Sequence, residues 1–289
     1  MALLRENADK TGGVSTNADT PPFFIYNIMN PEYQALAQGK PRLVERTYFL
    51  TPAECNPQQR MPLTLLINRL IEVATLHANE LGIGYADLVG YNQTWVLSRV
   101  AVEMTRYPGV NETYRVETWV ATVNRLFSER DFCFYDAEGN ILGWARTVWA
   151  VLDTVTRGAG DISRMAWIEA VALPDRCPVP KAGRLRPLAE YVSAPYRFTY
   201  CDIDFNRHVN SSRYIELLLN QWSLDFHDRN RLTRFEIAYL HEAYYDEPVD
   251  VRLSQSPDSA GGIQQGPTYA ELVNGDRALC RAALTFSPR

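Results

Sequence analysis

The feature that most constrains this chain is an order of elements that occurs twice. In the first half, residues 44–50 predict a strand and residues 64–78 an apolar helix. Period-two patterns then predict four strands at residues 94–103, 114–123, 126–135 and 141–151. The second half repeats the order, with a short strand at 197–200, a helix at 211–224 and strands at 234–243, 249–253, 268–273 and 277–286. The Asn274-Gly275 pair between the last two strands is a strong hairpin signal. Such a repeat predicts a tandem α+β chain.

The first helix carries too many apolar residues for a surface helix. Its apolar side chains cover far more than one narrow stripe, which indicates burial on most sides: Leu65, Leu66, Ile67, Leu70, Ile71, Val73, Ala74 and Leu76. A sheet curled around a hydrophobic helix is the hot-dog arrangement, and two copies in one chain would pair their sheets edge to edge. We therefore expect a partly disordered tail (1–40), an N-terminal hot dog (41–175), a proline-marked linker (176–190) and a C-terminal hot dog (191–289).

Composition narrows the classes of function. The net charge of −5 gives no support for nucleic-acid binding, and no apolar run is long enough for a membrane span. The start of the chain lacks the pattern of a secretory signal or a transit peptide. The five cysteines are scattered and form no CxxC pair. These features predict a cytoplasmic protein with reduced thiols, no metal site and no cofactor.

Catalytic residue types are densest between Asp202 and Asn210 (DIDFNRHVN), just before the second predicted helix. Asp204, Asn206 and His208 alternate there, so they surround the helix N-terminus. Free backbone N–H groups and the helix dipole at that point favour a developing negative charge, which is the logic of an oxyanion site. A structural interpretation stays open, because Asp and Asn are also common helix caps and His208 could be a packed surface residue.

The segment DIDFNRHVNSSRYIELLLNQ resembles the second-domain signature of acyl-carrier-protein (ACP) thioesterases of the plant type and their bacterial relatives. The resemblance continues in order through NQTWVLSRVAVEM, YRVETWV, ARTVWAVLD and RFEIAYLHEAYYDEPV, and covers most of residues 45–286. It implies a double hot-dog hydrolase that releases free fatty acid from fatty acyl-ACP and so ends chain elongation. Two alternatives stay open: an acyl-CoA thioesterase of the same superfamily, or a non-catalytic acyl-binding or dehydratase-like hot-dog protein.

The resemblance also assigns residues. The family's catalytic Asp, Asn and His fall on Asp204, Asn206 and His208, and its later Glu falls on Glu242. In many plant members a Cys follows that Glu; here it is Ala243, which argues against a Cys–His mechanism. The implied scheme has His208 oriented by Asp204 and Asn206, an oxyanion at the helix N-terminus, and Glu242 as base for an attacking water. Direct attack by Asp204 or His208 is the alternative.

The first copy lacks an acid–base set. Aligning the two helices places Cys55, Pro57 and Gln59 near Asp204, Asn206 and His208, so one site per chain is expected. The first copy can then hold the acyl chain, and the candidate binding residues are Leu66, Leu70, Val73, Trp95 and Asn210. For the apolar members, ordinary core packing is the competing interpretation. We expect His77 to be structural and His227 to be solvent-exposed.

The expected partner is an acyl carrier protein bearing an acyl-phosphopantetheine arm. Because carrier proteins are strongly acidic, they need a local basic patch on this acidic chain. The candidates are Lys181, Arg184, Arg186, Arg207 and Arg213. Single hot-dog units build a site by dimerising, whereas a tandem chain supplies both halves, so a monomer or a homodimer is expected.

Overall fold

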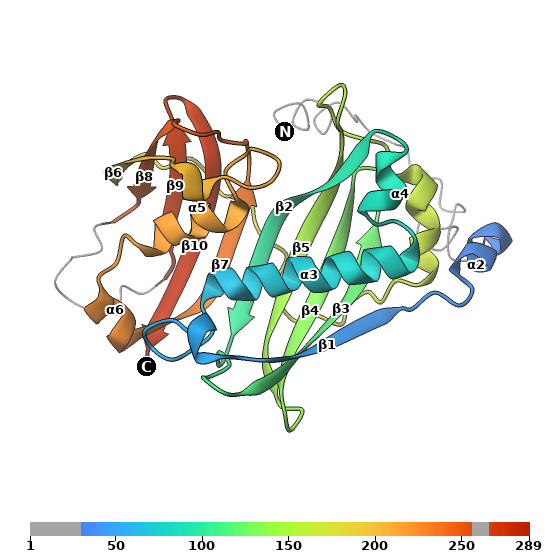
Figure 1. The fold of residues 1–289 in the computed structure, drawn as a ribbon, viewed down its shortest axis with the longest axis horizontal. Coiled ribbons are helices and arrows are strands. Elements are labelled where there is room, and N and C mark those ends of the chain that lie inside the picture. Colours follow the sequence, from blue (N-terminus) through green and yellow to red (C-terminus); the bar gives the residue numbers. More distant parts are fainter. Residues whose placement is uncertain (1–29, 256–265) are drawn as a thin grey trace, which may run out of the picture.

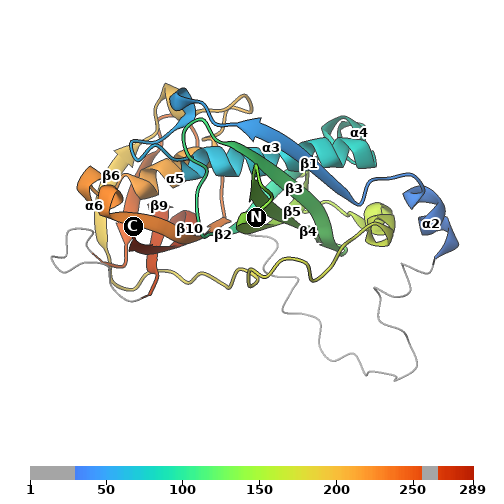
Figure 2. The ribbon, with the colours of Figure 1, turned by 90° about the horizontal axis from the view of Figure 1, so that it is seen from below.

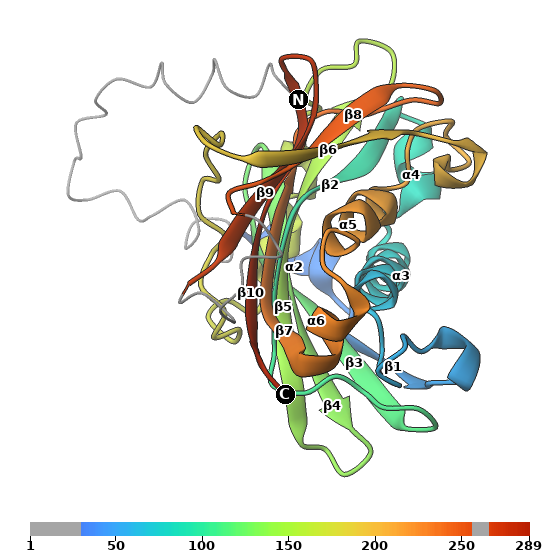
Figure 3. The same cartoon turned by 90° about the vertical axis from the view of Figure 1, so that its left-hand side faces the viewer.

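The computed structural model describes residues 30–255 and 266–289. Ten antiparallel strands form one sheet in the order β1-β3-β4-β5-β2-β7-β10-β9-β8-β6, and the two longer helices lie against one face of it (Figures 1 and 3). The strands are β1 (Leu43–Phe49), β2 (Gln93–Met104), β3 (Thr113–Val123), β4 (Phe127–Asp136), β5 (Ile141–Asp153), β6 (Val192–Arg197), β7 (Asn230–Tyr239), β8 (Pro248–Leu253), β9 (Thr268–Asn274) and β10 (Arg277–Pro288). The helices are α2 (Pro31–Ala37), α3 (Leu63–Leu81), α4 (Tyr85–Val89), α5 (Ser211–Leu219) and α6 (Leu224–Arg229), with 3₁₀ turns η2 (Pro52–Glu54), η3 (Ser163–Ala170) and η4 (Tyr200–Asp202).

The strand order is a mirror image about its centre. The first five strands, β1-β3-β4-β5-β2, are followed by β7-β10-β9-β8-β6 in the reverse sense. The seam between the halves is the β2–β7 pair, in which Val100 lies opposite Ile237 and Val102 opposite Phe235. The predicted edge-to-edge joining of two hot-dog sheets is therefore confirmed, as is the α+β double hot-dog class.

The long helix α3 is buried as its composition predicts. It runs three residues beyond the predicted end and stops at Gly82, whose φ of 79° is the left-handed conformation that suits glycine at a helix end. Leu66, Leu70 and Val73 are almost completely buried in the main hydrophobic core. The second helix is shorter than predicted, because α5 ends at Leu219 and a separate short helix, α6, follows.

Two other expectations need correction. The short strand predicted at 197–200 is wrong, because β6 covers Val192–Arg197 and residues 200–202 form a 3₁₀ turn. Pro195 hid this strand in the sequence, since proline is confined to edge strands, and β6 is the edge of the sheet. Of the predicted tail (1–40), residues 1–29 lie outside the described residues, whereas Pro31–Ala37 form α2.

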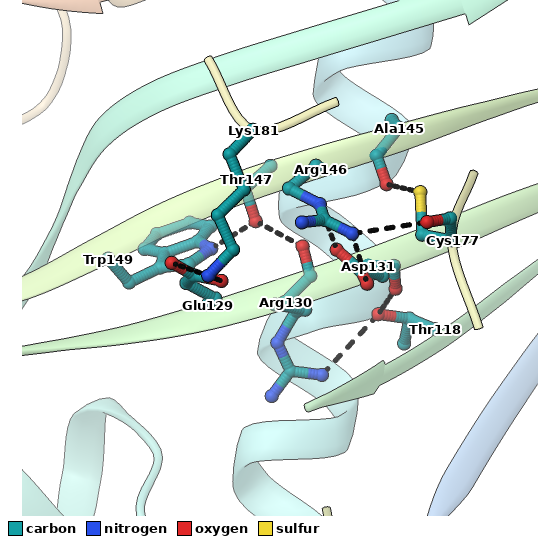
Figure 4. Close-up of polar contacts among 10 residues, drawn as sticks. All are labelled: Thr118, Glu129, Arg130, Asp131, Ala145, Arg146, Thr147, Trp149, Cys177 and Lys181. Carbon is teal, nitrogen blue, oxygen red and sulfur yellow. Dashed lines mark hydrogen bonds and ion pairs between the residues drawn. The ribbon is translucent and has the colours of Figure 1, made fainter. Parts of the chain in front are cut away.

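The connection between the halves, residues 171–191, runs along the sheet face opposite α3 and α5 (Figures 2 and 3). Cys177 and Val179 pack there against Trp119. Arg146 pairs with buried Asp131 at 3.1 Å and also donates to the Cys177 carbonyl at 3.2 Å (Figure 4). Burial raises the pKa of Asp131 to about 6. This network fastens the connection to the back of the sheet.

Within the described ranges, no helix combines the length and apolar character needed to cross a bilayer.

Candidate active site

The segment at residues 199–210, here called the C-terminal loop, leads from β6 into α5. Its first turn is held by Asp202, whose Oδ2 accepts hydrogen bonds from the Thr199 N–H at 2.6 Å and from the Tyr196 hydroxyl at 3.0 Å. Asp202 is buried. Its carboxylate is occupied by these structural contacts, so we assign it to holding the loop.

Asp204 sets the shape of the next turn. Its Oδ1 accepts the backbone N–H of Asn206 at 2.8 Å and that of His208 at 3.2 Å. Its own N–H donates to the His208 carbonyl at 2.8 Å. Arg207 closes the turn with a φ of 64°, the left-handed region where glycine is favoured. Asp204 therefore positions His208 through the backbone rather than through the imidazole.

His208 and Glu242 come together as the sequence predicts. His208 is half-buried, and its Nε2 lies 3.6 Å from Glu242 Oε2. Glu242 lies three residues beyond Tyr239, where β7 ends, so it is not part of the strand predicted at 234–243. The Tyr244 ring packs edge-on against the imidazole with 5.1 Å between centroids, and its hydroxyl donates to Glu242 at 3.4 Å.

Arg157 belongs to this site, and sequence reasoning missed it. Its guanidinium forms a close ion pair with Glu242 Oε2. Arg157 lies in the turn after β5, 85 positions away in sequence, and no motif marks it. The Glu242 carboxylate is thus held in place by an arginine from the other half of the chain.

The predicted oxyanion site at the start of α5 needs correction. Asn210 caps this helix, because its Oδ1 accepts the Ser212 N–H at 3.0 Å and its carbonyl accepts the Arg213 N–H at 2.9 Å. These are the groups that an oxyanion would need. Asn210, predicted to bind substrate, is therefore the helix cap, and it occupies the Ser212 and Arg213 N–H groups of the first turn.

A cavity of about 280 Å³ opens beside the C-terminal loop. Phe205 and Asn206 of the loop line it, and Phe205 is 88% exposed. The remaining lining is mostly apolar and comes from the first half: Ile71, Ala74, Thr75, Ala78, Ile83, Gly84, Tyr85, Thr94, Trp95, Ser128, Arg130 and Trp149. The cavity thus joins the polar loop of one half to the helix and sheet of the other.

The candidate acyl-binding residues divide in two. Trp95 lines the cavity, with its Nε1 fixed by a 2.8 Å bond to the Ile83 carbonyl. Leu66, Leu70 and Val73 do not line it, because they lie on the α3 face that packs into the core. The cavity meets the adjoining face of the same helix, at positions such as Ala74 and Ala78. Burial, which the sequence indicates for both faces, did not distinguish them.

A buried polar pair forms part of the cavity wall. Arg130 lines the cavity from β4 and donates to His77 Nδ1 at 2.7 Å. His77 Nε2 bonds to the Pro41 carbonyl at 3.0 Å, so its ring is structural, as expected. Burial, reinforced by the Arg130 charge, lowers the pKa of His77 to about 4. Burial also lowers the pKa of Arg130 to about 9.

The expectation for His227 needs correction. His227, expected to be exposed, is half-buried against Phe226 and Phe286, with its Nε2 bonded to the Leu219 carbonyl at 3.1 Å.

The sequence alignment of the two copies was wrong by one position. The starts of α3 and α5, Leu63 and Ser211, are 148 residues apart. The counterparts of Asp204, Asn206 and His208 are therefore Asn56, Gln58 and Arg60, which still include no carboxylate and no imidazole.

Comparison with known proteins decides the family. The profile of the acyl-ACP thioesterase N-terminal domain matches residues 41–165, and that of the C-terminal domain matches residues 185–287. The chain belongs to the acyl-ACP thioesterase family. It is therefore a thioester hydrolase, and the predicted activity, hydrolysis of fatty acyl-ACP thioesters, is confirmed at this level.

Individual relatives of the acyl-ACP thioesterase family agree in sequence and fold. A dodecanoyl-ACP hydrolase of Cinnamomum camphora, described as chloroplastic, is 26% identical over 84% of this chain and 67% of its own length. The crystal structure of an acyl-ACP thioesterase from Bacteroides thetaiotaomicron is 31% identical, with a TM-score of 0.77 over 85% of this chain and 98% of that one. The 12:0-ACP thioesterase from Umbellularia californica, 21% identical, shares the fold with a TM-score of 0.74 over 91% of this chain and 99% of that one.

Proposed function

We propose that His208 and Glu242 activate a water molecule for attack on the thioester carbonyl of a fatty acyl-ACP, with the acyl chain in the cavity beside them. The observation that carries this proposal is the approach of His208 Nε2 to Glu242 Oε2, 3.6 Å, next to the cavity-lining residues Phe205 and Asn206. Catalytic contacts of this kind are often long before substrate binds and shorten in the complex.

The reaction divides into two steps. Water loses a proton to the His208–Glu242 pair as its oxygen bonds to the carbonyl carbon, giving a tetrahedral oxyanion. The carbon–sulfur bond then breaks, and the departing thiolate takes up the proton as the phosphopantetheine thiol. The products are the free fatty acid and the unacylated carrier. Asp204 acts by positioning, because its carboxylate holds the backbone of His208.

We assign the oxyanion contact to Asn206. Asn210 accepts the Ser212 and Arg213 N–H groups of α5, whereas Asn206 is exposed and lines the cavity. Its side-chain amide supplies two N–H donors of the type that stabilise oxyanions. This assignment replaces the helix N-terminus in the scheme.

Water as the nucleophile is favoured over a side chain. Asp204 Oδ1 is engaged by two backbone N–H groups, and attack by this carboxylate would disturb the turn that positions His208. The residue that follows Glu242 is Ala243, which is buried, so no thiol stands at that position. Quenching the enzyme during turnover and measuring its intact mass by mass spectrometry tests whether water or a side chain attacks. We expect the unmodified mass, whereas an increase by one acyl group would establish a covalent intermediate.

The carrier is proposed to be ACP rather than CoA. Arg207, which flanks the site and is exposed, supports this. Arg213, at the start of α5, is partly exposed and forms an ion pair with Glu216. The linker candidates, Lys181, Arg184 and Arg186, are left out of this patch, because residues 171–191 run along the opposite face of the sheet (Figure 2). Release of thiol from dodecanoyl-ACP and dodecanoyl-CoA, measured at matched concentrations, tests the assignment. We expect a higher kcat/KM with ACP; equal or faster turnover of CoA would overturn it.

A cytoplasmic location and a monomeric state complete the proposal. All five cysteines are free, and burial raises the pKa of Cys133 to about 11 and that of Cys280 to about 12. Such thiols suit a reducing compartment. Both halves of the site come from one chain, so no second subunit is needed. Fractionation of the source cells and light scattering of the purified protein test these two points.

A further inference from the structure

The loop that precedes α3, residues 51–62 and here called the N-terminal loop, is a structural copy of the C-terminal loop. Each loop begins with a 3₁₀ turn fastened by the same contact. Glu54 accepts the Thr51 N–H at 3.0 Å, just as Asp202 accepts the Thr199 N–H at 2.6 Å. Thr51 and Thr199 are 148 positions apart, and so are Glu54 and Asp202. Equivalent residues therefore anchor the two loops by the same hydrogen bond.

The turn that carries the acid–base residues is also reproduced. In the N-terminal loop, the Arg60 N–H donates to Asn56 Oδ1 at 3.0 Å and the Asn56 N–H donates to the Arg60 carbonyl at 2.9 Å. His208 and Asp204 make the same two contacts, at 3.2 and 2.8 Å. Gln59, with a φ of 55°, occupies the left-handed position taken by Arg207 in the other loop. The chain has kept the backbone of a second site.

The chemistry of this second site has changed. Asn56, Gln58 and Arg60 stand where Asp204, Asn206 and His208 stand in the first. Tyr107 stands in place of Glu242, because Met61 donates to the Pro108 carbonyl as Val209 donates to the Ala243 carbonyl. No carboxylate or imidazole remains at these positions to move a proton. The loop therefore matches the C-terminal loop in backbone but not in acid–base residues. His227 does line the adjoining cavity, with its Nε2 bonded to the Leu219 carbonyl at 3.1 Å.

A cavity of about 590 Å³ adjoins the N-terminal loop. Four arginines line it, namely Arg60, Arg106, Arg231 and Arg289, and no described Asp or Glu does. Arg60 and Arg106 share Glu112 at 3.7 and 2.6 Å. Arg231 and Arg289 form no ion pair with any carboxylate of the described chain, and instead donate to backbone carbonyls. Burial lowers the pKa of Arg289, the nearby Arg60 and Arg231 charges lower it further, and the Asp228 carboxylate opposes them. Arg106 also pairs with Asp136 at 3.6 Å. Among the side chains that line the cavity, positive charge is still in excess.

The rest of the lining is largely apolar. It includes Met61, Leu63, Leu219, Trp222, Leu224, Leu232 and Phe286, which come from both halves of the chain. An apolar wall with arginines beside it suits a ligand that has an alkyl chain and an anionic head. A small inorganic anion would leave the apolar wall unused, and a neutral lipid would leave the arginines unmatched.

We propose that this second cavity binds a fatty carboxylate, with the head at Arg60 and Arg231 and the alkyl chain along Trp222 and Phe286, and holds it without turnover. It is the counterpart of the active site by the internal symmetry of the chain, converted from a catalytic to a binding site. The proposal does not depend on the reaction assigned to His208, because binding is measured with the ligand itself.

Location of the ligand gives the most direct test. Crystals of the whole chain are grown with 12-bromododecanoate, and the bromine is located by anomalous diffraction. We expect bromine density in the cavity beside Trp222 as well as in the one beside Trp95. Bromine only beside Trp95 would overturn the proposal.

Solution binding tests the role of the charge. Dodecanoate titrated calorimetrically into the whole chain should show two sites. The Arg60→Gln/Arg231→Gln double variant should weaken one of them at least tenfold, whereas Arg46→Gln, an arginine that lines neither cavity, should change neither. Dodecanol should bind the second cavity at least tenfold more weakly than dodecanoate. Unchanged dodecanoate binding in the double variant would overturn the proposal, whether the unmodified chain shows one site or two.

Discussion

At the scale of single residues, two histidines show how surroundings separate structure from chemistry. His77 is fully buried, and both of its ring nitrogens are bonded to fixed partners. His208 is half-buried, faces a carboxylate and lies next to a cavity-lining loop. Residue type alone does not distinguish them. The difference lies in hydrogen bonding: both ring nitrogens of His77 have fixed partners, whereas the His208 ring has a nitrogen available to a water or a substrate.

Asn206 tests the oxyanion assignment. Asn206→Asp keeps the side-chain shape but replaces the amide donors with a carboxylate, which repels a developing negative charge. We expect kcat to fall by about 10²-fold or more, the range for loss of an oxyanion donor, with a smaller change in KM. Asn210→Asp serves as the control, because aspartate also caps helices and should leave kcat near normal. Equal losses in both variants would count against the assignment.

His77 makes stability depend on pH. Its pKa is about 4 in the folded chain and near 6.5 when unfolded, so folding favours the neutral ring. The contribution is complete above about pH 6.5 and is lost as pH falls toward 4, by up to about 3 kcal/mol. His77→Gln removes the titrating group and should flatten this part of the curve. Urea unfolding at several pH values measures it, and an unchanged slope in the variant would contradict the account.

At the scale of elements, the loops and helices were predicted with unequal success. Helix α3 and most strands were found within a few residues, because each has a strong period of its own. The edge strand β6 was misplaced because Pro195 weakens its signal. The face of α3 that meets the cavity could not be predicted, since Leu70 and Ala78 are both buried and differ only in their neighbours.

Arg207 has a left-handed backbone conformation that is strained for a residue with a side chain, and a glycine would remove this strain. Because its φ is 64°, Arg207→Gly should stabilise the fold by up to about 1 kcal/mol. It should leave kcat near normal and raise KM for acyl-ACP, because it removes a charge assigned to the carrier contact. Arg207→Val should destabilise it by about 1–3 kcal/mol, since a β-branched side chain is strained there. Thermal unfolding and thiol release measure the two effects. A valine variant as stable as the original would show that the turn has another conformation.

The two faces of α3 should respond differently to substitution. Ala78→Leu adds bulk to the cavity wall, so activity should shift toward shorter acyl chains. Leu70→Ala removes core volume and should cost about 2–5 kcal/mol of stability with little change in chain preference. Exposed Ala53→Leu should change neither property. A panel of acyl-ACP substrates and urea unfolding separate these outcomes. A change in chain preference with Leu70→Ala would restore the original acyl-binding assignment.

At the scale of the whole molecule, a continuous sheet makes the two halves one structural unit. The β2–β7 seam is hydrogen-bonded along its length, and the active site draws Glu242 from one half and Arg157 from the other. The sequence predicted the repeat, the fold class and the approach of Glu242 to His208. It could not predict Arg157, because its role arises from a contact across the seam. The single-position error in aligning the loops also hid how closely they match.

The measurement that tests the central claim most directly is thiol release from dodecanoyl-ACP by His208→Ala and Glu242→Gln, with folding checked by circular dichroism. Both residues are partly exposed, so the folds should survive. We predict that each kcat falls at least 10²-fold, and that the double variant is little worse than either single one because the pair acts as a unit. A folded His208→Ala enzyme with near-normal kcat would show that the chemistry lies elsewhere in the molecule.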